Sequence, residues 1–147
     1  MVKSLLAEKI PTKHLSKKVK KVYLSWQEFN RAVLKLSKTL KKNRQIKNIY
    51  GIPRGGLILA VSLSHRLNIP LVLSESEISP QTLVVDDIYY TGKTINSLFS
   101  RHNLQQAVFW FRNQETAVPK DFEIISVKTK HSSEWLIFPW ETEKSAF

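Results

Sequence analysis

Two adjacent carboxylates and a small polar turn are the residues best suited to chemistry in this sequence. An apolar run at residues 83–85 leads into Asp86 and Asp87, and a short polar turn follows: Thr91, Gly92, Lys93 and Thr94. The apolar run is typical of a buried strand, and open α/β sheets bind ligands at the carboxyl ends of their strands. Carboxylates suit vicinal hydroxyls or a metal ion, whereas free N–H groups at a helix start suit phosphate. The pattern therefore predicts a site for a sugar phosphate.

A second loop able to hold phosphate lies upstream, in residues 51–56. Gly55 and Gly56 let the backbone approach a ligand closely, and Arg54 supplies a fork of donors suited to phosphate oxygens. Taken alone, this segment is equally typical of a tight turn between a strand and a helix.

The elements around these loops would bring them to one edge of a sheet. Ser25 and Glu28 form a capping box before a helix whose apolar residues repeat at three- and four-residue spacing. We expect further helices at residues 57–67 and 95–101, and strands at residues 49–52, 71–73, 83–85, 107–111 and 122–127. Strands that alternate with helices predict an α/β fold, with a mainly parallel sheet flanked by helices on both faces.

Length and composition fit one globular domain with a basic extension. The chain has 147 residues, of which 42% are hydrophobic and 24% charged, as is usual for a single domain. No apolar run is long enough to cross a bilayer, and the first residues do not form a signal peptide. We expect a cytoplasmic protein with no membrane partner, built from a basic N-terminal arm at residues 1–21 and a single domain at residues 22–147.

The formal net charge of +11 stands out from an otherwise ordinary composition. Such a charge favours polyanionic or phosphorylated partners. The cations gather in the N-terminal third: Lys17, Lys18, Lys20, Lys21, Lys35, Lys38, Lys41, Lys42, Arg44 and Lys47. A charge run is usually a solvated face, and nucleic-acid binding is the functional alternative that it leaves open.

Both loops resemble motifs of one enzyme family. Residues 83–94 are similar to the phosphoribosyl pyrophosphate signature of the type I phosphoribosyltransferases, and residues 51–56 are similar to the pyrophosphate loop of that family. The ending Trp-Leu-Ile-Phe-Pro-Trp-Glu at residues 135–141 resembles the small xanthine-guanine and hypoxanthine phosphoribosyltransferases. The resemblance runs from about Val22 to Glu141, leaves the N-terminal arm outside it, and implies a small C-terminal hood over the base.

The resemblance implies an activity. The protein would transfer a phosphoribosyl group from phosphoribosyl pyrophosphate to a nucleobase, a 6-oxopurine (guanine, xanthine or hypoxanthine), and release pyrophosphate in purine salvage. Its partners would be phosphoribosyl pyrophosphate and the base or the product nucleotide. The resemblance further implies Mg²⁺, which Asp87 would hold mostly through the substrate, and a homo-oligomer, a dimer or a tetramer.

The resemblance also assigns roles residue by residue. Asp86 and Asp87 would bind the ribose hydroxyls and stabilise the cationic sugar. The 5′-phosphate would be held by the turn: Tyr90, Thr91, Gly92, Lys93 and Thr94. The pyrophosphate would be held by the upstream loop: Arg54, Gly55 and Gly56. The base would meet the Trp135 ring by stacking, the Leu136 backbone at its edge, and the Arg112 cation at its oxygen.

Two features depart from the family pattern. Purine members usually have an aspartate where this chain has Tyr90, and that aspartate handles a proton at N7 of the base. A neutral phenol, with an ordinary pKa of about 10, is a poor base. The link at residues 74–82 is also much shorter than the family's mobile loop, which closes over the sugar and excludes water. Its hydroxyls would cap only part of the site: Ser74, Ser76 and Ser79.

These departures support an alternative function. Tyr-Thr-Gly followed by a basic residue also resembles the bacterial pyrimidine-operon attenuation proteins, which have a phosphoribosyltransferase-like fold and bind RNA. The alternative is a non-catalytic or weakly catalytic nucleotide-sensing regulator that binds nucleic acid through its basic surface.

Overall fold

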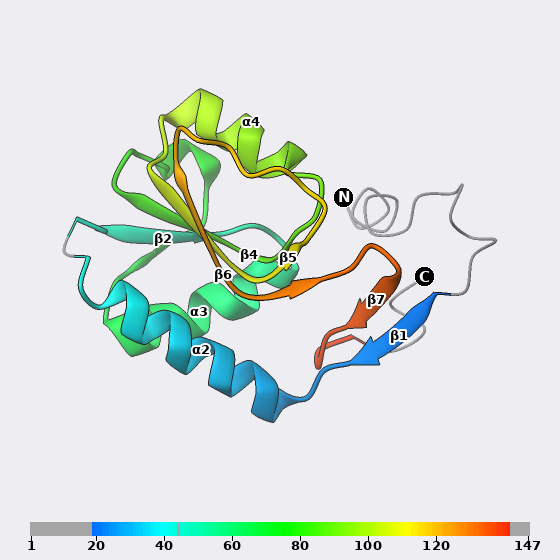
Figure 1. Cartoon of the computed structure of the whole chain (residues 1–147). Coiled ribbons are helices and arrows are strands. Elements are labelled where there is room, and N and C mark those ends of the chain that lie inside the picture. Colours follow the sequence, from blue (N-terminus) through cyan, green and yellow to red (C-terminus); the bar gives the residue numbers. More distant parts are fainter. Residues whose placement is uncertain (1–18, 44, 142–147) are drawn as a thin grey trace.

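The computed structural model describes residues 19–43 and 45–141. Most of the expected basic arm, residues 1–18, and Arg44 lie outside the described residues. The core is a five-stranded parallel sheet of order β3-β2-β4-β5-β6 (Figure 1). Its strands are β2 Asn48–Gly51, β3 Leu71–Val72, β4 Thr82–Tyr89, β5 Gln106–Asn113 and β6 Glu123–Lys130. The predicted parallel α/β sheet is confirmed.

Helices cover both faces of this sheet, as predicted. α2 (Trp26–Leu40) and α3 (Gly55–Leu67) lie on one face and α4 (Lys93–His102) on the other (Figure 1). The predicted capping box begins α2: Ser25 Oγ accepts from Glu28 N at 3.1 Å, and Glu28 Oε2 accepts from Ser25 N at 2.8 Å. None of the helices in the described ranges is both long and apolar enough to cross a membrane.

The central strand β4 is buried along its whole length, between two apolar clusters. Val85 packs with the cluster under α2 and α3, which includes Leu36 and Leu59, whereas Val84 packs with Leu98 of α4. A strand covered on both faces needs a continuous apolar run. Packing on both sides fixes β4 firmly, and so fixes the carboxylates near its end.

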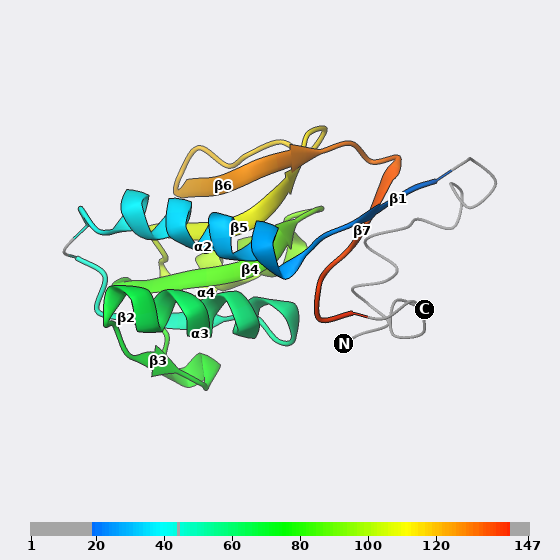
Figure 2. The same ribbon diagram turned by 90° about the horizontal axis from the view of Figure 1, so that it is seen from below.

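A second, two-stranded parallel sheet forms a hood beyond the carboxyl ends of the central strands (Figure 2). It pairs β1 (Lys20–Tyr23) with β7 (Glu134–Ile137), in the register Lys20 to Glu134 and Tyr23 to Ile137. The sequence does not predict β1, because the string Lys-Lys-Val-Tyr has no apolar alternation. The expected boundary between arm and domain, after residue 21, falls inside this strand.

Strand and helix ends differ from the sequence prediction by a few residues. β4 continues through Asp86 and Asp87 because pairing with β5 continues to Tyr89 opposite Arg112. Arg112 therefore lies within β5 rather than just after it. α3 and α4 each begin two residues earlier than expected, because their first turns consist of small or polar residues that carry no apolar period.

Candidate functional site

Two buried carboxylates lie near the carboxyl end of the central strand. The side chains of Asp86 and Asp87 belong to residues that are only 8% and 6% exposed. Asp86 Oδ1 accepts a hydrogen bond from the Asp87 backbone N–H at 2.8 Å, which fixes the orientation of that carboxylate. Burying carboxylates is costly unless they meet donors or cations. Carboxylates of this kind can bind sugar hydroxyls or a metal ion and can stabilise a developing positive charge.

The glycine loop lies directly against these carboxylates. A Cβ at Gly55 would overlap Oδ2 of Asp87, and one at Gly56 would lie 2.5 Å from the Val85 carbonyl oxygen. Gly55 opens α3, Arg54 is its exposed N-cap residue, and the peptide between Pro53 and Arg54 is cis. The fold thus brings the upstream loop and the acid pair together, as predicted.

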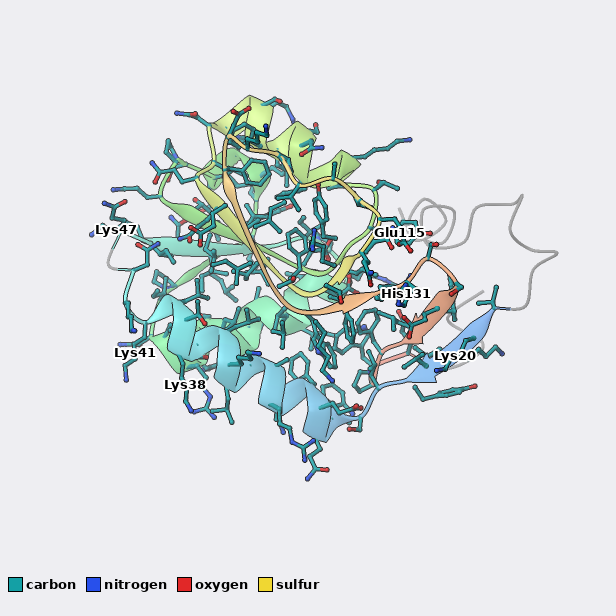
Figure 3. The ribbon with its side chains drawn as sticks, viewed as in Figure 1. Lys20, Lys38, Lys41, Lys47, Glu115 and His131 are labelled. Atoms are coloured by element: carbon teal, nitrogen blue, oxygen red, sulfur yellow. The ribbon has the colours of Figure 1, made fainter. Side chains whose placement is uncertain are left out.

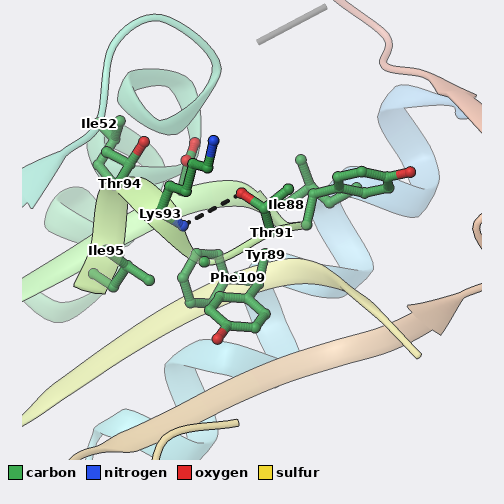
Figure 4. A pocket seen from close by; sticks show the side chains of 11 residues that line it. Ile52, Ile88, Tyr89, Thr91, Lys93, Thr94, Ile95 and Phe109 are labelled. Atoms are coloured by element: carbon green, nitrogen blue, oxygen red, sulfur yellow. Dashed lines mark hydrogen bonds between the residues drawn. The ribbon is translucent and has the colours of Figure 1, made fainter. Parts of the chain in front are cut away.

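The polar turn begins α4. Gly92 is its N-cap at φ +83°, in the left-handed region that favours glycine, and α4 starts at Lys93. Thr91 Oγ1 accepts from Lys93 N at 3.3 Å (Figure 4). The side chains of Lys93 and Thr94 are exposed. The helix N-terminus therefore offers backbone donors, an ammonium and hydroxyls, a combination that binds phosphate well.

A hollow joins this turn to Asp86 of the acid pair (Figure 4). It contains about 400 Å³ of space, part of it open to solvent, and its lining includes Ile52 after β2, Asp86 of β4 and Gly92 before α4. Asp86 and the polar turn thus share one hollow at the carboxyl edge of the sheet, whereas Asp87 and the glycine loop do not line it.

The residues expected at the base lie on the hood and at the end of β5. The Trp135 side chain is 4% exposed and packs with Ile137 and Val19, whereas the Leu136 side chain packs into the main core. Arg112 is half-buried opposite Tyr89. None of the three lines the hollow beside the phosphate turn.

Tyr90 occupies the position where purine members of the resembling family have an aspartate. Its ring is 9% exposed and belongs to the main core, and Lys130 Nζ lies 4.9 Å from the ring centroid. Burial raises the pKa of the Tyr90 phenol, and Glu115 raises it further. A phenol with a raised pKa is an even weaker base than an ordinary tyrosine.

Sequence reasoning missed Lys130, the last residue of β6, which is only 3% exposed. The available signal was its position, because it ends a strand at the same sheet edge as the acid pair.

The loop after β5 is tied to the end of β4, and the sequence did not reveal this. The Thr116 hydroxyl donates to the Tyr90 carbonyl, and the Tyr89 hydroxyl donates to the Ala117 carbonyl at 3.0 Å. Asn113 Nδ2 donates to Thr116 Oγ1 at 3.0 Å. These bonds hold the β5–β6 loop beside the phosphate turn.

The short link before β4 does not form a lid over the site. It contains a 3₁₀ helix, η2 (Glu75–Glu77), and Glu75 forms an ion pair with Arg101 at 2.8 Å. Arg101 lies in the last turn of α4, about one helix length (~15 Å) from the phosphate turn. The hydroxyls of Ser74 and Ser76 bond each other at 2.8 Å, and Ser79 Oγ accepts from the backbone of Gln81. These serines stabilise the link itself.

Comparison with known proteins agrees with the fold. No family model matches the chain. It is 29% identical to the xanthine-guanine phosphoribosyltransferase of Idiomarina loihiensis (strain ATCC BAA-735 / DSM 15497 / L2-TR), over 81% of this chain and 86% of that relative.

Solved structures that align with the chain include phosphoribosyltransferases. The purine phosphoribosyltransferase from Pyrococcus horikoshii Ot3 aligns with a TM-score of 0.66 and 27% identity, covering 83% of this chain and 95% of that one. The Helicobacter pylori xanthine-guanine-hypoxanthine phosphoribosyltransferase aligns with a TM-score of 0.59 over 84% and 95% of the two chains, and its 17% identity supports a common fold alone.

The parallel sheet with its flanking helices is the fold of the type I phosphoribosyltransferases, and the relatives support a phosphoribosyltransferase. Within that class the chain is close to the xanthine-guanine and hypoxanthine enzymes, as the sequence resemblance indicated.

Proposed function

We propose that this enzyme transfers the phosphoribosyl group of phosphoribosyl pyrophosphate to a 6-oxopurine and releases pyrophosphate, as in purine salvage. The observation that carries the proposal is the arrangement at the end of β4. There the Asp87 carboxylate lies against Gly55 of one phosphate loop, and Asp86 shares a hollow with Gly92 of the other. The xanthine-guanine relative supports the choice of a 6-oxopurine.

Each part of the site has a distinct task in this reaction. Asp86 and Asp87 bind the ribose hydroxyls and stabilise positive charge that develops on the sugar. The start of α4 holds the 5′-phosphate through its backbone N–H groups, with help from the side chains of the turn. Arg54 and the N–H groups of Gly55 and Gly56 hold the pyrophosphate. Positioning and electrostatic stabilisation supply most of the rate, because the leaving group is already activated.

A magnesium ion fits the donors at this site. Mg²⁺ is usually held by one or two carboxylates together with substrate phosphates and water. The described residues contain no cluster of three or more His, Cys, Asp or Glu side chains that would bind a metal alone. Asp87 would therefore hold the ion mostly through the substrate. When bound, the ion would neutralise charge on the pyrophosphate.

We propose that the base lies under the hood, with its ring stacked on Trp135. The Leu136 backbone would meet its edge and Arg112 its oxygen. Because the Trp135 side chain is almost fully buried, this role requires the hood to move when the base enters.

The experiment is turnover with a panel of bases. Purified protein is incubated with Mg²⁺, phosphoribosyl pyrophosphate and guanine, xanthine, hypoxanthine, adenine, uracil or orotate, and pyrophosphate and nucleotide are measured. We expect turnover with one or more of the three oxopurines. Turnover restricted to adenine or to a pyrimidine would contradict the proposed base.

A second function, nucleic-acid binding, is favoured by the outer face of α2. This face and the turn that follows it present five exposed cations: Arg31, Lys35 and Lys38 on the helix, and Lys41 and Lys42 just after it. In the described parts of the chain, none of them forms an ion pair. Figure 3 shows Lys38 and Lys41 directed away from the sheet.

The dependence of RNA binding on salt concentration tests this second function. RNA held by such a face should bind much more weakly at 200 mM than at about 50 mM salt, and replacing Lys35, Lys38 and Lys42 by Glu should abolish binding. Replacing the distant exposed Lys120 by Glu serves as the control. Absence of binding even at the lower salt concentration would remove this candidate.

We also propose a homo-oligomer, a dimer or a tetramer. Leu73 and Val61 are 76% and 41% exposed, so apolar side chains are available for a subunit contact. Light scattering on the purified protein measures the mass, and a monomer at micromolar concentration would contradict the proposal.

A further inference from the structure

A groove lined by amide side chains runs along the amino edge of the main sheet. It consists of two hollows of about 980 and 210 Å³, both partly open to solvent, which share part of their lining. The lining of the first includes residues from the end of α2 and the start of β6, and the second reaches the start of β4. We call the two hollows together the amide groove, after five of the residues that line it: Asn43, Gln45, Gln81, Gln105 and Gln106.

The amide groove is separate from the candidate site. Thr82, the first residue of β4, lines the groove, whereas Tyr89, the last, lines the hollow beside the phosphate turn. The extended strand separates these two residues by about 23 Å. Figure 1 and Figure 2 both show the end of α2 on the side of the sheet away from the hood. A ligand in the groove would therefore leave the reaction site open.

The amides of this groove are available to a ligand. Within residues 19–43 and 45–141, none of its four glutamine side chains has a hydrogen-bond partner, and three of them are exposed. Asn43 Oδ1 accepts from the Gln45 backbone N–H at 3.0 Å, which leaves the Asn43 NH₂ group as a donor. An amide offers a donor and an acceptor side by side, and in this way it pairs with N6 and N7 of adenine. The Glu123 carboxylate, also in the lining, can accept from an amino group.

A row of cations leads into the amide groove. Arg31, Lys35 and Lys38 are exposed and, at four- and three-residue spacing, lie on one side of α2. Lys42, just after the helix, lines the groove itself. None of these four cations has an ion-pair partner among the described residues. The row on the helix is about 10 Å long, with its cations about one turn apart. A flexible polyanion can therefore run along α2 and enter the groove.

Cations that lead to a row of amides fit a single strand of RNA better than a duplex. Cations bind phosphates whatever the sequence, and contacts to base edges supply the selectivity. The major groove of duplex RNA is too deep and narrow for side chains, so proteins read sequence mainly in unpaired segments. Leu40 and Ile125 add apolar walls to the groove, against which a flat base can pack. The lining thus provides for both the edge and the face of an unpaired base.

We propose that the amide groove holds unpaired adenine bases of a single-stranded RNA whose backbone lies along Arg31, Lys35 and Lys38. The inference rests on the second function proposed above for RNA binding itself, and on the groove for the preference for unpaired adenine. Because the groove and the phosphate turn lie at opposite ends of β4, the protein binds RNA and phosphoribosyl pyrophosphate at the same time.

Fluorescence anisotropy with labelled RNA tests the groove. The probes are oligo(A), oligo(U) and a duplex, each of about 12 nucleotides per strand. We expect wild type to bind oligo(A) about 10-fold more tightly than oligo(U), and both more tightly than the duplex. Gln45→Ala combined with Gln106→Ala should make the affinities for oligo(A) and oligo(U) equal. Gln106 begins β5, and Gln114, an exposed glutamine directly after the other end of that strand, gives the matched control. Gln114→Ala should leave the preference unchanged.

A cation variant separates phosphate contacts from base contacts. Lys38→Gln should weaken oligo(A) and oligo(U) by the same factor and reduce the slope of log affinity against log salt concentration by about 0.7. The two alanine substitutions in the groove should leave that slope unchanged, because they remove no charge. All variants should keep the turnover of wild type, since they lie away from the phosphate turn.

The outcomes distinguish the groove from the second function. Equal binding of oligo(A) and oligo(U) by wild type, or a preference that survives in the groove variant, would overturn the groove and leave RNA binding in place. Binding of the duplex as tight as that of oligo(A) would do the same. Absence of binding of every probe at about 50 mM salt would overturn the second function and this inference together. Phosphoribosyl transfer is measured separately by turnover, so none of these results decides it.

Discussion

Gly55 and Asp87 bring the glycine loop and the acid pair into direct contact. The carboxylate occupies the space that a Cβ at position 55 would need. The sequence separately predicts a glycine loop and an acid pair, and their order along the chain suggests one site. Their direct contact could not be predicted, because it depends on how β2 and β4 pair in register.

Asp87→Asn should lower turnover strongly while leaving the fold intact. The amide keeps the shape but removes the charge that the proposed function directs at the sugar and its metal, so kcat should fall by about 10²–10³-fold. The unfolding temperature should stay within about 4 °C of wild type. Steady-state kinetics and a thermal melt measure both quantities. The exposed Asp121→Asn is the control, and unchanged kcat in Asp87→Asn would remove its assigned role.

Gly92→Ala should destabilise the phosphate turn. The φ of +83° costs a residue with a side chain about 1–2 kcal/mol, and its Cβ would lie 2.6 Å from the Tyr89 hydroxyl oxygen. In a Tyr89→Phe background that oxygen is gone, so the same substitution should cost less. Urea unfolding of the four proteins measures the coupling. Strictly additive losses would mean that the hydroxyl does not crowd this position.

Elements are where sequence prediction succeeded best and where its limits are clearest. The capping box and apolar spacing of α2 correctly predicted that helix, and the apolar runs correctly predicted each strand of the main sheet. The ends of these strands were predicted wrongly because pairing extends β4 and β5 past their apolar residues. β1 was missed because its basic, largely exposed residues become a strand only when β7 lies beside them.

Because of the capping box, the stability of α2 should depend on pH in the acidic range. The hydrogen bond from the Ser25 backbone lowers the pKa of Glu28 below its ordinary value of 4.5. A carboxylate with a lowered folded-state pKa stabilises the fold above pH 4.5, and this contribution disappears as the pH falls through the lower folded value. Urea midpoints for wild type and Glu28→Gln should therefore differ at pH 6.5 and converge near pH 3. A difference between the two urea midpoints that grows as the pH falls would contradict this explanation of the pH dependence.

At the scale of the whole molecule, an aromatic cluster fastens the hood to the domain. Trp140, after β7, stacks on Phe138 with centroids 5.1 Å apart, and packs edge-on against Phe29 of α2 at 5.6 Å. Trp110 of β5 lies 6.3 Å from the same ring. These contacts give Trp140 a packing role. Its position links hood, helix and sheet.

Trp140→Leu should loosen this attachment. Loss of a half-buried indole should reduce the free energy of unfolding by about 2–3 kcal/mol. If the hood positions the base, nucleotide affinity should fall as well. Trp26→Leu is the matched control, since Trp26 touches the same cluster but is 52% exposed, and should cost less than about 1 kcal/mol. Equal losses in the two variants would mean that Trp140 is not the attachment.

The pairing of β1 with β7 has a consequence for biosynthesis. These strands come from opposite ends of the described chain, and the hood forms only when both are present. Synthesis delivers N-terminal segments first, and contacts between distant segments form late because closing a long loop costs entropy. On the ribosome, the phosphate loops on β2 and β4 are therefore made while β1 still lacks its partner. If the proposed assignments hold, the nascent chain would complete its sugar-phosphate site before its base site, and would select among bases only once β7 has left the ribosome.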